Sequence, residues 1–135
     1  MIQINPFEAE TDGIIVRVAP EFLDEESSPE DNRYVWAYHV EIRNEGKRTL
    51  RLITRHWRIA DCNGRVQVVD GEGVVGQTPV LEPGETFEYS SGAPLSAPSG
   101  LMDGVYRLSD ENGDILDVRI PMFTLDSPYD TRIAN

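Results

Sequence analysis

Hydrophobic residues alternate with polar ones in short runs along this chain, and turn sequences separate the runs. The clearest alternation covers residues 34–43, where the polar residues His39, Glu41 and Arg43 stand between apolar positions. The apolar positions are Tyr34, Trp36, Tyr38, Val40 and Ile42. A period of two residues is typical of a β-strand with one face in the core. We therefore predict a central strand over this segment.

Six further runs, rich in β-branched and aromatic residues, have the length and composition of strands. In the second of them the apolar residues change parity, which predicts a β-bulge near Ile53 or Thr54 because a regular pleat would expose half of them. Asn63-Gly64 and Asn112-Gly113 predict tight hairpin turns with positive φ at both central residues. The six runs cover residues 13–22, 49–61, 65–70, 86–92, 101–110 and 115–123.

Helical periodicity is nearly absent, so the chain is predicted to be all-β. The strand number favours a two-sheet sandwich of the immunoglobulin or fibronectin type III kind, with about seven strands. Tyr106 follows a proline-rich connection, where such sandwiches place a tyrosine corner. We predict a single domain over residues 1–135, with its core at about 13–125 and a loosely held tail at 126–135.

Gly71, Gly73 and Gly76 form a G-x-G-x-x-G pattern. In dinucleotide-binding proteins this pattern joins a parallel strand to a helix whose N-terminus meets the pyrophosphate. Pro79 and Pro83 exclude such a helix here, so the Rossmann interpretation fails. The glycines instead indicate a bulge or a close approach of two backbone segments. A backbone nest for a small anion stays open, because it needs no helix.

The basic cluster Arg55, His56 and Arg58 is the main candidate for ligand binding. If Trp57 points into the core, His56 and Arg58 face outward and can lie near the glycine stretch. Together with Gly71, Gly73 and Gly76 they would form a site for pyrophosphate or a nucleotide. The alternative is that these cations pair with surface carboxylates.

Catalytic and metal chemistry find little support in the sequence. The chain contains two histidines, His39 and His56, and one cysteine, without the spacing of a zinc site. The histidines could approach each other only if their strands pair. Cys62 lies beside Asp61, and a neighbouring carboxylate makes a thiol a weaker nucleophile. We therefore expect no enzyme activity, no cofactor and no protein-bound metal.

Charge and cysteine content limit the environment and the partners. Twenty-four acidic residues against twelve basic ones give a net charge of −12, which opposes binding to nucleic acid or to an anionic membrane. An acidic segment at residues 21–31 is predicted to be a solvated loop, although magnesium or cobalt could meet it. A single cysteine and the absence of an apolar signal segment predict a cytoplasmic protein.

Four stretches carry a resemblance to a known family: RHWRIAD, DGEGVVGQTPVLEPGETFEYSSGAPL, GLMDGVYRL and IPMFTL. They are similar to the ApaG family, also called the ApaG or DUF525 domain. The chain departs from the family pattern at Gln77-Thr78, Ala97 and Ser99. The resemblance implies a fibronectin type III-like sandwich and supplies no established catalytic residues.

The same resemblance links bacterial members genetically to cobalt tolerance and magnesium efflux, and to genes beside a diadenosine tetraphosphate hydrolase. Eukaryotic relatives occur in F-box and polymerase-interacting proteins, where the domain is taken to bind protein. We therefore predict a non-catalytic protein-interaction module, with sheet-edge pairing, including a homodimer, as one mode. The alternative is a small-ligand protein that holds pyrophosphate, a nucleotide or a divalent cation near Arg55, His56 and the glycine stretch.

Overall fold

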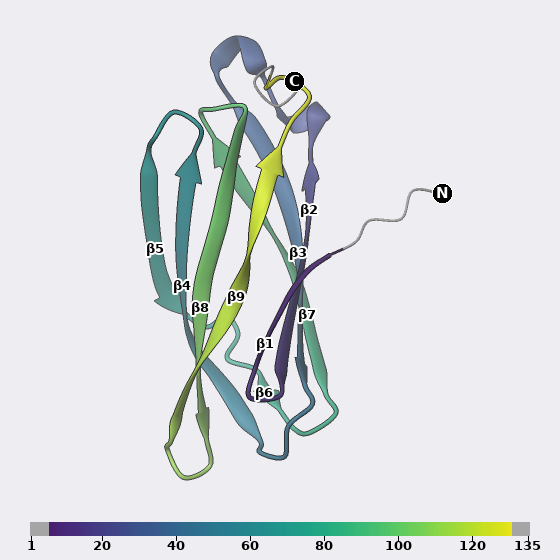
Figure 1. The fold of residues 1–135 in the computed structure, drawn as a ribbon, viewed down its shortest axis with the longest axis vertical. Coiled ribbons are helices and arrows are strands. Elements are labelled where there is room, and N and C mark those ends of the chain that lie inside the picture. The colour runs from purple at the N-terminus through teal and green to yellow at the C-terminus, as the bar shows by residue number, and fades with distance from the viewer. Residues whose placement is uncertain (1–5, 131–135) are drawn as a thin grey trace, which may run out of the picture.

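Two antiparallel sheets pack face to face in the computed structural model, which describes residues 6–130 (Figure 1). The first sheet has the order β1 (Phe7–Thr11), β2 (Ile14–Phe22), β3 (Tyr34–Asn44) and β7 (Thr86–Leu95). The second has the order β5 (Val66–Glu72), β4 (Leu50–Asp61), β8 (Ser99–Asp110) and β9 (Ile115–Asp126), and β6 (Val80–Leu81) also pairs with β4. The predicted two-sheet, all-β sandwich is confirmed.

The strand count is nine rather than seven among the described residues, because the sequence analysis missed β1 and β6. The short β1 contains Glu8 and Glu10, so its apolar signal is weak, and β6 has only two residues. Two short 3₁₀ turns, η1 (Asp24–Glu26) and η2 (Pro29–Asp31), occupy the predicted acidic loop. Within residues 6–130 no helix has the length and apolar character needed to cross a membrane.

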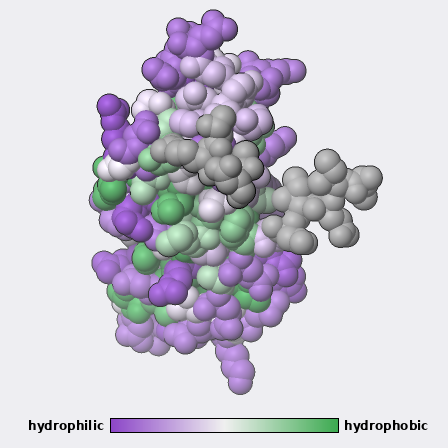
Figure 2. Space-filling model, turned by 45° about the horizontal axis from the view of Figure 1, so that its top comes forward, coloured by the Kyte–Doolittle hydropathy of each residue, from purple (hydrophilic) through white to green (hydrophobic). Residues whose placement is uncertain are grey.

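Strand β3 confirms the predicted alternation. Its five predicted apolar residues are all buried, whereas His39 and Arg43 are exposed. The predicted bulge in β4 is also confirmed, because the register with β8 shifts between Leu52 and Thr54. Figure 2 shows how hydropathy is distributed over one face of the molecule. Hydrophilic residues cover both ends of the sandwich, and hydrophobic residues are visible across the middle.

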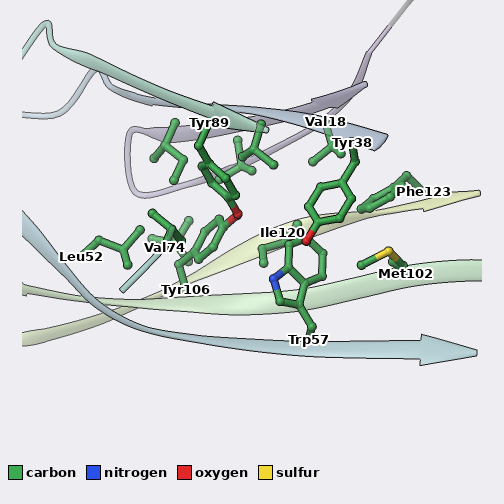
Figure 3. Close-up of a cluster of buried hydrophobic side chains, with 14 of the residues drawn as sticks. Val18, Tyr38, Leu52, Trp57, Val74, Tyr89, Met102, Tyr106, Ile120 and Phe123 are labelled. Carbon is green, nitrogen blue, oxygen red and sulfur yellow. The ribbon is translucent and has the colours of Figure 1, made fainter. Parts of the chain in front are cut away.

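Aromatic side chains from both sheets fill the centre of the core (Figure 3). Trp57 of β4 contacts Tyr38 of β3, with ring centroids 5.4 Å apart, and Phe123 of β9 at 5.9 Å. The hydroxyl groups of Tyr89 and Tyr106 share a buried hydrogen bond between the two sheets. Tyr106 lies in the middle of β8 and pairs with a side chain, so the predicted tyrosine corner is replaced by a tyrosine pair.

The two Asn-Gly turns form as predicted but with a different backbone conformation. Gly64 and Gly113 adopt positive φ, whereas neither asparagine does. Each loop is closed by the aspartate that precedes it: Asp61 Oδ1 accepts hydrogen bonds from two backbone N–H groups of its turn, and Asp110 Oδ1 does the same. These contacts favour a three-residue loop with one αL glycine.

The beginning of the predicted tail packs against the sandwich. Ser127 and Asp130 are buried, and the Ser127 hydroxyl donates to the carbonyl of Pro98 at 2.6 Å. The Ser99 hydroxyl donates to the Asp130 carboxylate. The prediction of a loose tail therefore does not describe residues 127–130, and residues 131–135 lie outside the described part of the chain.

Candidate functional site

Arg55 reaches from β4 towards the glycine stretch on β5. Arg55 lies opposite Gly71 in the β4–β5 register, and its Nη1 donates to the carbonyls of Glu72 and Gly73, both at 2.9 Å. A Cβ atom at residue 71 would lie 2.6–2.7 Å from the guanidinium group. Glycine at residue 71 therefore makes room for an arginine side chain, whereas the predicted close approach of two backbone segments occurs at Gly73, beside the carbonyl of Gln77.

The contact between Gly71 and Arg55 predicts a coupled effect of Gly71→Ala. The added methyl group should displace the guanidinium and break its two hydrogen bonds, lowering the free energy of unfolding by about 1–2 kcal/mol. Urea denaturation followed by tryptophan fluorescence measures the loss. In the Arg55→Ala background the same substitution should cost almost nothing further. Equal losses in both backgrounds would contradict the account.

His56 and Arg58 point outward, as predicted, and each meets a carboxylate. His56 Nδ1 lies 2.5 Å from Asp70 Oδ1. Arg58 contacts Asp103 through Nε at 3.1 Å and Nη2 at 3.2 Å. The Asp103 carboxylate raises the pKa of Arg58 through this hydrogen bond and its charge. His56 and Arg58 therefore contact surface carboxylates, as the second interpretation of the cluster predicted, whereas Arg55 donates to backbone carbonyls instead.

The glycine stretch ends in a tight turn rather than an open nest. Val74 and Gln77 exchange two backbone hydrogen bonds, and the Gly73 N–H donates to the carbonyl of Ile53 at 2.7 Å. The two residues at the centre of this turn, Val75 and Gly76, adopt φ values of 43° and 79°, respectively. Three of the amide donors that an anion would need are thus already paired. No helix follows Gly76 in the described residues, which agrees with the rejection of a Rossmann fold.

The six predicted site residues therefore form no common cradle. A groove of about 590 Å³ beside β4 and β5 is lined by Arg55, His56 and Gly71, together with Arg107 of β8. Asp117 pairs with Arg107 at 2.9 Å, and this contact lowers the pKa of the aspartate. Arg58, Gly73 and Gly76 do not line this groove. Ligand binding at the cluster stays a prediction.

The two histidines lie on different sheets and cannot approach each other. His39, on the outer face of β3, contacts the Ser90 hydroxyl at 2.8 Å and Glu88 at 3.2 Å. His56 belongs to β4 in the other sheet. Across residues 6–130 no three histidine, cysteine or acidic side chains gather as a metal site would require.

The open edge of β5 is a candidate functional feature that the sequence pattern does not predict. Within residues 6–130 this strand pairs only with β4, and its outer face exposes 60 % of Val66 and 53 % of Val68. Hydrophobic residues show at the left margin of Figure 2, on the side where Figure 1 places β5. Alternation in "RVQVVD" predicts the strand, but its position at an edge depends on the packing of distant strands.

The fold and the site define a two-sheet β-sandwich domain with one open, apolar edge strand. The ApaG domain model (DUF525) matches residues 24–110. The chain belongs to the ApaG family, which confirms the resemblance found in the sequence.

Relatives support this assignment over most of the chain. The chain is 56 % identical over 119 residues to Protein ApaG of Rhodospirillum centenum, covering 88 % of this chain and 92 % of the relative. A crystal structure of an ApaA protein from Bordetella pertussis is similar with a TM-score of 0.83 and 45 % identity, covering 94 % of this chain and 99 % of that one. The C-terminal domain of Wzt, at 12 % identity and a TM-score of 0.54, shares the fold alone; the similarity covers 93 % of this chain and 80 % of that domain.

Proposed function

We propose that this protein is a non-catalytic interaction module that binds another protein by adding a strand to β5. The observation that carries the proposal is the unprotected edge of β5. Its register with β4 runs without interruption from Val66 to Glu72. The charged residues of the strand, Asp70 and Glu72, stand at its C-terminal end, and it contains neither lysine nor proline. Natural proteins normally protect a sheet edge with such residues, with bulges or with a covering segment.

The backbone of β5 supports strand addition. The Asp61 N–H donates to the carbonyl of Arg65, and the Gly73 N–H donates to that of Ile53. Hydrogen-bonded and non-bonded pairs alternate along an antiparallel ladder. The odd-numbered residues of β5 therefore bond to β4. Val66, Val68 and Asp70 direct their N–H and C=O groups towards the open side.

The other three edges are less available. Thr11 of β1 accepts a hydrogen bond from the Arg119 N–H of β9, and Phe7 packs against Phe123 of β9 at 6.3 Å, so these two edges cover each other. Strand β7 contains Gly92 and Pro94, which weaken strand pairing. An extended segment of a partner therefore finds its best template on β5.

Val68→Pro tests this function. Proline removes a backbone N–H that faces the open side and leaves the bonds to β4 in place, so the fold should survive while strand addition is blocked. Immobilised wild-type protein should capture a partner from extract of the source cells, identified by mass spectrometry. Calorimetry on the purified pair should then show binding weakened by about tenfold or more in the variant.

Val68→Thr is the matched control, because threonine keeps the N–H and the β-branched shape. It should bind within about threefold of wild type, since it changes a single contact. Circular dichroism and urea denaturation check that both variants are folded, and Val68→Lys replaces the proline variant if that one unfolds. A partner that binds the wild type and a folded edge variant equally well would reject the proposal.

The second candidate function is small-ligand binding, and the groove beside Arg55, His56 and Arg107 favours it. Pyrophosphate, diadenosine tetraphosphate, Mg²⁺ and Co²⁺ are the probes, each titrated and followed by NMR. Saturable shifts at Gly71, Gly73 and Gly76 with micromolar affinity would support this function. Absence of such shifts would reject it.

A further inference from the structure

We infer that the segment that pairs with β5 is extended, apolar on both faces beside Val66–Val69, and basic beside Asp70 and Glu72. This inference rests on the proposed function, and it specifies the chemistry of the partner. Three features of β5 carry it: the outer face of the strand, the groove on its inner side and the charges at its C-terminal end.

The outer face favours β-branched or aromatic residues on the partner. Val66 and Val68 are more than half exposed and lie on the same face two residues apart. A paired strand would place two of its side chains directly beside them. Cross-strand pairs of β-branched and aromatic residues are the combinations that stabilise neighbouring strands. Such a pair would also remove both valines from water.

The inner side offers a place for a further apolar residue. A groove of about 520 Å³ lies between β5 and the end of β7. Apolar residues of both strands line it, and Asp61 and Arg65 add charged groups at its margin. Ile59 and Leu95 are partly buried and pack against the core, so they give the groove an apolar floor. Side chains alternate between the faces of a strand. One residue of the added strand, on its inner face beside Gln67, would therefore point towards this groove.

The charge of β5 is concentrated at its C-terminal end. Asp70 meets His56 but keeps 70 % of its side chain exposed, and Glu72 forms no ion pair within the described residues. The Glu72 carbonyl accepts a hydrogen bond from Arg55, which ends the open part of the edge. A lysine or arginine on the partner beside these carboxylates would add complementary charge, and it would be favoured by the net charge of −12.

A second copy of this chain fits the edge less well. Residues directly opposite each other in an antiparallel pair lie on the same face. Arg65 lies on the face opposite to that of Asp70 and Glu72, so no register of two β5 strands brings it directly opposite either carboxylate. Two copies would also repel each other, because each carries a net charge of −12. The occupant is therefore a different chain with a basic residue.

Selection from a random peptide library tests this chemistry. Displayed peptides of about nine residues, long enough for one strand, are selected on the wild-type protein. The enriched sequences should alternate β-branched or aromatic residues and carry lysine or arginine towards one end. When these peptides bind, the changes in the protein's amide NMR shifts should be largest for the residues of β5. Val68→Pro should weaken their binding by about tenfold, and Val68→Thr should preserve it.

Glu72→Lys tests the charge separately. The selected basic peptides should bind this variant about fivefold or more weakly, and reselection on it should enrich aspartate or glutamate at the same position. Peptides without a basic preference, or equal binding to Glu72→Lys, would overturn the inference. If a natural partner still depends on Val68 but not on Glu72, the proposed function stands and the basic segment is rejected. A wild-type dimer that Val68→Pro dissociates, seen by light scattering, would also overturn it.

Discussion

Replacing Trp57 by alanine should lower the free energy of unfolding by about 3–5 kcal/mol, the range for large aromatic side chains in a core. Trp57 is 3 % exposed and stands at the centre of the aromatic cluster, in contact with Tyr38, Tyr106 and Phe123. Truncation removes the transfer free energy of the indole and leaves a cavity between the sheets. Because these rings come from three other strands, they cannot collapse into the space without moving both sheets.

Urea denaturation measures this loss, and the remaining tryptophan, Trp36, serves as the fluorescent reporter. Trp57→Phe should cost less than Trp57→Ala, since it keeps a ring in contact with Tyr38 and Phe123. Met122→Ala, at a half-exposed position on β9, should change stability by only about 0.5 kcal/mol. A Trp57→Ala loss no larger than that of the exposed control would show that the indole contributes no packing.

Alkaline pH should unfold the protein, with stability falling as pH rises above about 10, the ordinary pKa of tyrosine. Burial raises the pKa of Tyr89 and of Tyr106 well above this value in the folded state. The unfolded chain releases these protons first, so their contribution is complete below pH 10 and is lost as pH rises towards the folded pKa values. Between the unfolded and the folded pKa values, each tyrosine that stays neutral in the folded state lowers the free energy of unfolding by about 1.4 kcal/mol per pH unit.

Urea denaturation followed by circular dichroism between pH 8 and about pH 11.5 measures this dependence, below the range in which arginine titrates. The variant Tyr89→Phe/Tyr106→Phe should reduce the pH dependence, because it removes two ionisable groups and the hydrogen bond that joins them. Burial also raises the pKa of Tyr38, which should leave a smaller remainder. Each single variant should be less stable than the double variant, since it leaves one hydroxyl buried without its partner. A double variant that keeps the full alkaline loss would assign the effect to other groups.

The sequence determines the strands because alternation is a local property. The period of two in residues 34–43 identifies β3 with its buried face, and the parity change near Ile53 identifies the bulge in β4. Trp57 pointing inward and His56 and Arg58 pointing outward follow from the same rule. The proline residues after Gly76 exclude a helix for the same local reason. Where alternation is weak, as in β1 and β6, the sequence pattern predicts no strand.

The candidate site depends on contacts between residues far apart along the chain. That Gly71 admits the guanidinium of Arg55 follows from the β4–β5 register, and that His56 and Arg58 meet Asp70 and Asp103 follows from strand order. Local pattern carries no information on strand order, because any two strands with an apolar face can pair.

Sequence alone thus determined the all-β class, the main strands and their buried faces, because the apolar positions of the alternation are the ones that become buried on folding. Tertiary structure alone decided that the tail packs on the sandwich, that the histidines lie on opposite sheets and that β5 is an open edge. Whether an edge is covered depends on the final position of every other strand. Hydrogen bonding across that edge is therefore a property of the assembled sandwich.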